Sequence, residues 1–241
     1  MSALRTKCGV TRLGRIEYSE GLSLQQGHLQ DWRVGVGVNR VIVLEHPHTI
    51  TIGRAGTVSD VLADEHTLKE RGIEVHTTDR GGEVTYHGPG QLIAYPIVNL
   101  RFLANDVLRY VRLLEESVIV FLKRMGIGAE RVAGRTGVWV GTDKICAIGV
   151  KVTRLPGQSA LVTSHGLALN VSTDLRYFSH IVPCGQPDAG VTSLSVATSH
   201  PHRMEEVRHN WLQAFSEVFN LNLYDILDNG GMKVDQPTAT Y

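Results

Sequence analysis

Short stretches in which apolar and polar residues alternate make up most of the chain, and three longer stretches repeat apolar residues at helical spacing. Alternation places successive side chains on opposite faces of a strand, whereas the longer repeat gives a helix one apolar face. The pattern predicts helices over 19–32, 105–125 and 204–219. It predicts strands over 12–18, 40–45, 49–52, 73–77, 83–86, 91–100, 137–140, 145–152 and 161–171.

The stretch from Leu92 to Val98 is almost wholly apolar, which is typical of a strand covered on both faces. A central strand of this kind, with helical segments before and after it, predicts an α+β fold with a mixed β-sheet flanked by helices. Asn105 is a suitable N-cap for the helix over 105–125. No repeat or linker divides the chain, so we expect one domain over 1–241, with a core over about 8–228 and a polar tail over 229–241.

Composition excludes several classes of partner. Apolar residues make up 42% of the 241 residues, and 24 basic residues balance 24 acidic ones, so no net charge attracts nucleic acid or an anionic membrane. The first residues contain no apolar run of signal-peptide length, and no stretch approaches the roughly 18 apolar residues of a membrane span. We therefore expect a cytoplasmic protein without a nucleic-acid or membrane partner.

The three cysteines, Cys8, Cys146 and Cys184, are an odd number and lack CxxC spacing. This argues against a disulfide framework and against a structural zinc site, so we expect reduced thiols. His46 and His48 form an HxH pair, but no nearby acidic residue or cysteine completes a usual ligand set. We expect no metal.

Cys184 follows Pro183 and precedes Gly185, in a segment that a second proline, Pro187, also stiffens. A nucleophilic thiol needs a rigid bend that exposes the sulfur and a neighbouring cation or base that favours the thiolate. The alternative interpretation is a cysteine that fills a tight turn. Cys146, inside an apolar run, is better explained as a small core residue.

The segment from Arg80 to Gly90 reads RGGEVTYHGPG, and its glycines allow a backbone to approach a ligand closely. A hairpin with tight turns would explain the same composition. The spacing fits neither the phosphate-binding GxxxxGK[ST] loop nor GxGxxG.

Two further residues are candidates for chemistry. Lys144 begins an apolar strand, where its ammonium is poorly hydrated, although a solvated lysine at a strand end is the commoner case. His165 precedes a glycine in another strand, where a lone histidine is more often a satisfied core residue than a catalyst.

Together these segments resemble the lipoyl(octanoyl) transferase family, also called lipoate-protein ligase B. The resemblance runs through most of the chain and is most specific in the order RGGEVTYHGPGQL, KICAIG and PCG. Weaker matches are Leu13-Gly14, Tyr18, 44–47, 51–54, 137–140, 165–170 and 191–194. The resemblance implies the class II synthetase-like catalytic fold that biotin and lipoate protein ligases share.

The resemblance also implies roles for individual residues. Cys184 matches the family's nucleophile, and Lys144 matches the lysine that lowers the pKa of that cysteine and moves protons. The segments that match the family's acyl-binding stretches contain Arg80, Gly81, Gly82, Glu83, Val84, Thr85, Tyr86, His87, Ala147, Ile148, Gly149, Gly166, Leu167 and Ala168. His165 is a possible accessory residue, and the backbone amides near Gly149 or His165 are candidates for stabilising an oxyanion.

The implied reaction moves an octanoyl group from octanoyl-acyl carrier protein, through a Cys184 thioester, to the lysine of a lipoyl domain. The acceptors would be the E2 subunits of 2-oxoacid dehydrogenases and the glycine cleavage H protein. No ATP and no cofactor is needed, because a thioester becomes an amide. Two alternatives stay open: an ATP-dependent lipoate or biotin ligase on the same fold, and a module that binds an acyl chain or a lipoyl domain without catalysis.

Overall fold

An eight-stranded mixed sheet forms the centre of the protein. The computed structural model describes residues 5–157, 159–182 and 190–226, so Cys184 and the tail predicted over 229–241 lie outside the described residues. The strands run in the order β11 (Leu221–Asp225), β1 (Thr6–Arg15), β2 (Arg40–Glu45), β6 (Gln91–Ile97), β10 (Leu161–Asn170), β9 (Asp143–Arg154), β8 (Arg135–Val140) and β7 (Glu130–Val132). Strand β1 is parallel to both of its neighbours, and the other pairs are antiparallel. The predicted α+β fold with a mixed sheet is confirmed.

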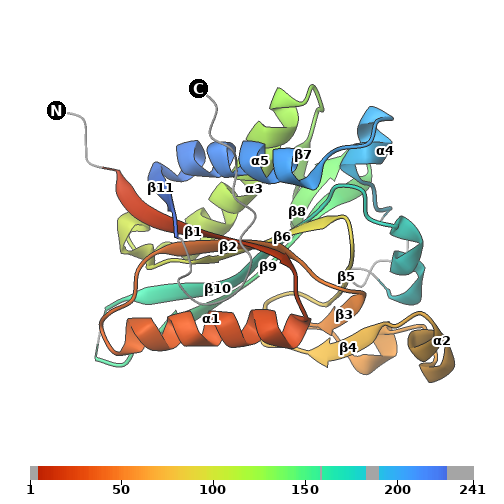
Figure 1. Cartoon of the computed structure of the whole chain (residues 1–241), viewed down its shortest axis with the longest axis horizontal. Coiled ribbons are helices and arrows are strands. Elements are labelled where there is room, and N and C mark those ends of the chain that lie inside the picture. The colour runs from red at the N-terminus through yellow and green to blue at the C-terminus, as the bar shows by residue number, and fades with distance from the viewer. Residues whose placement is uncertain (1–4, 158, 183–189, 227–241) are drawn as a thin grey trace.

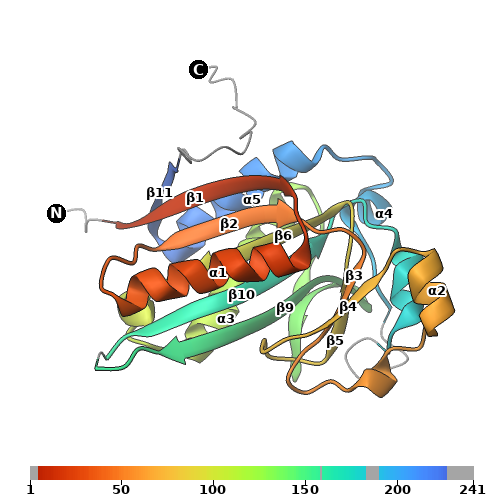
Figure 2. The same cartoon turned by 60° about the horizontal axis from the view of Figure 1, so that its bottom comes forward.

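Helices cover both faces of this sheet (Figures 1 and 2). Helices α3 (Val107–Arg124) and α5 (Met204–Phe219) pack on one face, and α1 (Tyr18–Arg33) packs on the other. In β2, Val41 and Val43 belong to the core beneath α3 and α5, whereas Ile42 and Leu44 belong to the core beneath α1. Strand β6 is buried along its whole length, which confirms that it is covered on both faces.

A second, three-stranded sheet lies beside the ends of β9 and β10 (Figure 2). It has the order β4 (Glu74–Thr77), β3 (Thr49–Ile52), β5 (Val84–His87). Its apolar core includes Ile50, Tyr86 and Phe178. The remaining helical elements are short: η1 (Val58–Asp60), α2 (Glu65–Glu70), η2 (Leu100–Leu103), η3 (Leu175–His180) and α4 (Leu194–Thr198).

Several predicted boundaries differ from the structure, and two of the differences change the place of a named residue. Strand β1 ends at Arg15, and Tyr18 is the first residue of α1 rather than the last of the strand. The N-cap of α3 is Asp106, whose carboxylate accepts a hydrogen bond of 2.8 Å from the Arg109 amide. Asn105 instead adopts a left-handed conformation with φ of 59°. None of the helices in the described ranges is long and apolar enough to cross a membrane.

Candidate active site

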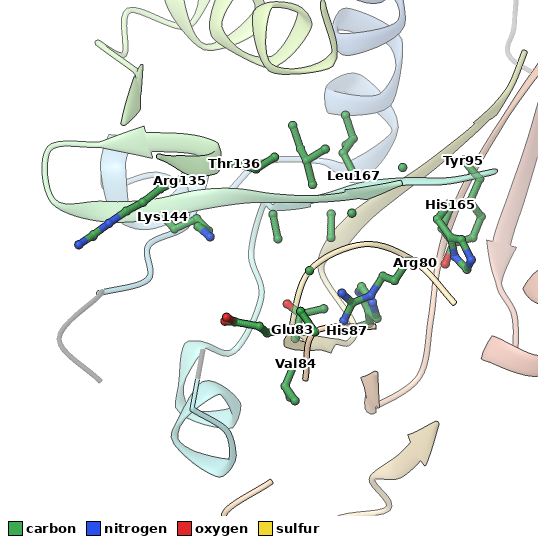
Figure 3. A pocket seen from close by; sticks show the side chains of 18 of the residues that line it. Arg80, Glu83, Val84, His87, Tyr95, Arg135, Thr136, Lys144, His165 and Leu167 are labelled. Atoms are coloured by element: carbon green, nitrogen blue, oxygen red, sulfur yellow. The ribbon is translucent and has the colours of Figure 1, made fainter. Parts of the chain in front are cut away.

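A cavity of about 330 Å³ lies between the large sheet and the loop that leads into the small sheet. Figure 3 shows Lys144 and Arg135 at one end and His165 and Tyr95 at the other. The strands β9 and β10 form one wall, and residues of the 80–87 segment form the opposite wall. The cavity is therefore an elongated slot that runs along the strands.

Most of the residues that the sequence suggested for the site line this cavity. They are Arg80, Gly82, Glu83, Val84, Thr85, His87, Lys144, Ala147, Ile148, Gly149, His165, Gly166, Leu167 and Ala168. The residues come from two sheets and are separated by up to 88 positions in the chain (168 minus 80). The fold thus brings three separate sequence segments to one site.

Gly81 and Tyr86, in contrast, do not line the cavity. The Gly81 amide donates a hydrogen bond of 2.9 Å to the carbonyl oxygen of Val150, which ties the loop to β9. The Tyr86 side chain is fully buried in the core of the small sheet, and its hydroxyl lies 2.7 Å from His48 Nδ1. Gly81 therefore ties the loop to β9, and Tyr86 anchors β5 in the core of the small sheet.

Lys144 is held at its end of the cavity by backbone pairing and by close packing. Its ammonium nitrogen lies 4.8 Å from the ring centroid of Trp139, within cation–π range. Gly137 has a φ of 129°, and a Cβ added there would lie 3.3 Å from Lys144 Cε and 2.7 Å from the Cys146 carbonyl oxygen. Glycine at 137 therefore leaves room for the lysine side chain.

At the opposite end, His165 occupies an unusual backbone position. Its φ is 56°, although it lies within β10. Its amide donates a hydrogen bond of 2.6 Å to Gln25 Oε1, so that amide is already used and does not serve as the expected oxyanion donor. Its Nε2 lies 2.8 Å from Asp79, and burial lowers the pKa of the imidazole. At the next residue, Gly166, a Cβ would lie 2.1 Å from the Ala94 carbonyl oxygen.

Two more histidines lie in the polar layer around the cavity. His46 Nδ1 lies 2.8 Å from the Ile16 carbonyl oxygen and Nε2 lies 2.8 Å from the Tyr95 hydroxyl. Burial lowers the pKa of His46 to about 4. Burial, with the nearby His46 adding to it, lowers the pKa of His87 to about 3. Both rings are neutral at physiological pH.

These pKa values predict that the protein loses stability in mild acid. In the unfolded chain a histidine takes up a proton near pH 6.5, whereas folded His46 and His87 resist protonation until about pH 4 and 3. The unfolded state therefore binds more protons, and each histidine lowers the free energy of unfolding by about 2 kcal/mol at pH 5 relative to pH 7. Urea denaturation at the two pH values measures the effect.

Equal unfolding free energies at pH 7 and pH 5 in the unsubstituted protein would contradict burial of neutral His46 and His87.

The described thiols are unsuited to nucleophilic chemistry. Cys8 and Cys146 are both fully buried. Burial raises the pKa of the Cys8 thiol to about 12 and holds the pKa of Cys146 well above its ordinary value. Both therefore stay protonated and unreactive at neutral pH. For Cys146 this agrees with the interpretation as a core residue.

Backbone hydrogen bonds fix the chain on both sides of the Cys184 segment. Before it, the Val182 amide donates a hydrogen bond of 2.8 Å to the Asp60 carbonyl oxygen. After it, the Gly190 carbonyl oxygen accepts a 2.9 Å hydrogen bond from the Lys144 amide. Lys144 also forms a parallel bridge with Val191. The segment that contains Cys184 thus leads directly into the backbone that pairs with Lys144.

The two histidines of the HxH pair lie in different surroundings. His46 contacts Tyr95 and belongs to the layer below α1, whereas His48 stacks on Tyr177 at a centroid distance of 4.2 Å. Among the residues that the structure describes, no group of three or more His, Cys, Asp or Glu side chains is placed to hold a metal ion.

Several cavity residues were not predicted as site residues from the sequence. They are Tyr18, Ala55, Tyr95, Gly134, Arg135, Thr136 and Trp139. Tyr18 and Trp139 lie in segments that carry the family resemblance, which is a signal that could have identified them. Tyr95 is the only hydroxyl-bearing residue within the apolar Leu92 to Val98 run. Arg135 and Thr136 have no comparable signal.

Comparison with known proteins places the chain in a family. The lipoyl protein ligase A/B catalytic domain model matches residues 17–216. The octanoyltransferase of Solibacter usitatus is 44% identical over 90% of this chain and 94% of its own length. The bipartite lipoate protein ligase of Thermoplasma acidophilum has a TM-score of 0.67 at 20% identity, covering 92% of this chain and 88% of that chain. For the biotin protein ligase of Aquifex aeolicus the TM-score is 0.51 at 16% identity, with coverages of 88% and 70%.

The two structural matches have low sequence identity, and they therefore show the fold alone. They confirm the biotin and lipoate protein ligase fold that the sequence resemblance implied. The identity to Solibacter usitatus octanoyltransferase extends over nearly the full length of both chains. The chain belongs to the lipoyl protein ligase A/B catalytic-domain family and, within it, to the octanoyltransferases.

Proposed function

We propose that the protein transfers an octanoyl group from octanoyl-acyl carrier protein to the side chain of a specific lysine on a lipoyl domain. The observation that carries this proposal is the slot between the two sheets, which has Lys144 at one end and is lined by Val84, Ile148 and Leu167. The names of the relatives, which are octanoyltransferases, support the same reaction.

The nucleophile of the proposed reaction is Cys184. The two described thiols are buried and protonated, which leaves Cys184 as the one cysteine suited to the role. Chain connectivity supports a joint role of Cys184 and Lys144. Gly190 and Val191 follow Cys184 by a few residues, and both pair with the Lys144 backbone. A nearby ammonium favours the thiolate over the thiol.

The first half-reaction forms an acyl-enzyme. The Cys184 thiolate attacks the thioester carbonyl carbon, the bond from that carbon to the carrier sulfur breaks, and the carrier leaves as a thiol after it takes up a proton. In this proposal Lys144 supplies that proton. The products are a Cys184 octanoyl thioester and free carrier protein.

The second half-reaction transfers the acyl group to nitrogen. The amine of the lipoyl-domain lysine attacks the Cys184 thioester, and the carbon–sulfur bond breaks to restore the thiolate. Lys144 accepts the proton that the attacking amine loses. One thioester is consumed and one amide is formed, so no ATP is required.

The slot accounts for recognition of the acyl chain. Apolar contact contributes about 0.8 kcal/mol for each buried CH₂ group. An eight-carbon chain lying along Val84, Ile148 and Leu167 would therefore gain several kcal/mol before the costs of ordering. We propose the lipoyl domains of 2-oxoacid dehydrogenase E2 subunits and the glycine cleavage H protein as acceptors.

A transfer assay tests the proposal against its two alternatives. The protein is incubated with octanoyl carrier protein and an unmodified lipoyl domain in the absence of ATP. The mass of the lipoyl domain is then measured by mass spectrometry. We expect it to gain one octanoyl group. Modification that requires free octanoate and ATP would indicate a ligase instead, and a stable complex without modification would indicate a binding module.

A further inference from the structure

A continuous chain of buried hydrogen bonds runs from the cavity wall into the interior of the protein. It begins at Arg80, whose Nε and Nη2 donate to Thr51 Oγ1 at 3.2 and 2.9 Å. Thr51 Oγ1 lies 3.3 Å from His87 Nε2. A guanidinium has only donors, so the Thr51 oxygen accepts from Arg80 and its own hydrogen points to His87.

The chain continues on the other side of the imidazole. His87 Nδ1 lies 2.9 Å from Gln91 Oε1. Gln91 Nε2 donates to Asn170 Oδ1 at 2.9 Å, and Asn170 Nδ2 donates to the Thr192 carbonyl oxygen at 3.0 Å. Apart from the 3.3 Å contact between Thr51 and His87, the bonds of the chain measure 2.9 to 3.2 Å, within ordinary hydrogen-bond distance. Gln91 and Asn170 are nevertheless 79 positions apart in the sequence.

The direction of the chain is fixed by groups that cannot reverse. The Tyr86 carbonyl oxygen lies 3.1 Å from Gln91 Nε2, and a carbonyl only accepts, so the amide nitrogen of Gln91 must lie on that side. The Thr192 carbonyl fixes the Asn170 amide in the same way. Gln91 Oε1 consequently faces His87 Nδ1, which must carry the ring proton.

This arrangement determines what His87 can do. Its Nδ1 donates to Gln91 and its Nε2 accepts from Thr51, so both ring nitrogens are engaged. Although His87 lines the cavity, neither nitrogen is available to accept a proton from a substrate. His87 is therefore better suited to fix its neighbours than to act as a general base.

The far end of the chain reaches the backbone of Lys144. Thr192, whose carbonyl accepts from Asn170, donates its amide hydrogen to the Lys144 carbonyl oxygen at 3.0 Å. Gln91 and Asn170 are only 1% and 4% exposed and do not line the cavity. These two amides connect the acyl-binding wall at Arg80 and His87 with the segment that holds Lys144.

We propose that Gln91 and Asn170 are positioning residues for acyl transfer. Through a hydrogen-bond chain whose donors and acceptors cannot exchange roles, they hold the Lys144 segment at a fixed position relative to the acyl-binding wall. The proposal rests on the proposed function. Removing one amide leaves buried donors and acceptors unpaired and allows the segment at 190–192 to shift. A displacement of about 1 Å at a reacting group can lower a rate about 100-fold.

The first test is kinetic. Gln91→Met keeps a similar side-chain volume and removes the amide. We expect kcat for octanoyl transfer to fall about 10- to 100-fold, with KM for octanoyl carrier protein nearly unchanged because the variant leaves the protein surface intact. Ser117→Ala is the matched control, since Ser117 is a fully buried hydroxyl that accepts from Trp211 on the far side of the large sheet. It should keep the unsubstituted kcat.

The second test is spectroscopic and needs no catalysis. In long-range ¹H–¹⁵N spectra of histidine-labelled protein we expect His87 to be neutral, with its proton on Nδ1, from pH 7 to pH 5. In Gln91→Met this preference for Nδ1 should be lost. A proton on Nε2 in the unsubstituted protein, or titration of His87 between pH 5 and 7, would overturn the proposal.

The two tests separate the proposal from the function on which it rests. If the unsubstituted protein transfers no octanoyl group, the proposed function fails, whereas the spectra still report the hydrogen-bond chain. If the unsubstituted protein is active and Gln91→Met keeps its kcat, the positioning role alone is overturned.

Discussion

Replacing Cys184 with serine is expected to lower octanoyl transfer to a lipoyl domain about 10⁴-fold or more, a loss typical of removing a catalytic nucleophile. A thiol ionises partly near neutral pH, and an ammonium beside it increases that fraction. A serine hydroxyl remains protonated under the same conditions. The rate of lipoyl-domain acylation under single-turnover conditions measures the effect.

The other two cysteines provide the control for this substitution. Cys146→Ala removes a buried, protonated thiol in β9, and Cys8→Ala removes another in β1. Each variant should transfer the octanoyl group at close to the unsubstituted rate if it folds. If the Cys184→Ser variant retained a tenth of the unsubstituted transfer rate, Cys184 would be excluded as the nucleophile.

Replacing Lys144 with methionine is expected to lower transfer by about 10²- to 10⁴-fold, the range of general acid–base catalysis. Methionine matches the length of the aliphatic stem that packs beside Gly137, and the backbone pairing with 190–192 does not depend on the side chain. The fold should therefore persist. The same single-turnover assay, run across pH, should show the loss at every pH.

Lys123→Met is the matched control, because Lys123 is an exposed lysine in the last turn of α3. It should leave the transfer rate unchanged. Normal transfer by Lys144→Met, with circular dichroism unchanged, would make Lys144 a structural residue at the start of β9 and remove it from the proposed mechanism.

Much of the fold could be predicted from the sequence because its central elements have strong local patterns. The strands at Arg40–Glu45 and Thr49–Ile52 and the helix at Met204–Phe219 have the predicted bounds. In each case a continuous apolar run or an apolar pattern with one period is bounded by polar or turn-forming residues. These elements form or cover the two sheets, which is why the fold class was correct.

Two of the segments that were missed depend on a distant partner. Strand β11 is short and largely exposed, and it is stabilised by parallel pairing with β1, more than 200 positions earlier in the chain. Local pattern carries little information about such a partner. The first residues of β1 were missed for the same reason, because Thr6 to Val10 pair with β11.

The sequence predicts most of the residues that line the candidate site, but it does not predict which of them contact one another. The glycine-rich segment, Lys144 and the 166–168 strand were identified from the sequence, and the fold brings them to one cavity. Tyr86 and His87 are neighbours in β5, and successive side chains in a strand point to opposite faces. Tyr86 therefore enters the core of the small sheet while His87 faces the cavity.

The hydrogen-bond chain from the cavity wall into the interior could not be inferred from any single segment. Its partners Thr51, His87 and Asn170 come from three strands in two sheets, and only the folded chain sets their distances. Gln91 directly follows the glycine-rich segment and begins a predicted strand, so the sequence gives it no separate role. Its contacts show that it also fixes the orientation of His87.

The account depends most on the acyl-enzyme at Cys184, and the mass of the intact protein tests it directly. After brief incubation with octanoyl carrier protein and no acceptor, we expect the protein to gain one octanoyl group that hydroxylamine removes, and we expect Cys184→Ser to gain none. Transfer to a lipoyl domain without any such adduct, or an undiminished adduct in Cys184→Ser, would contradict it.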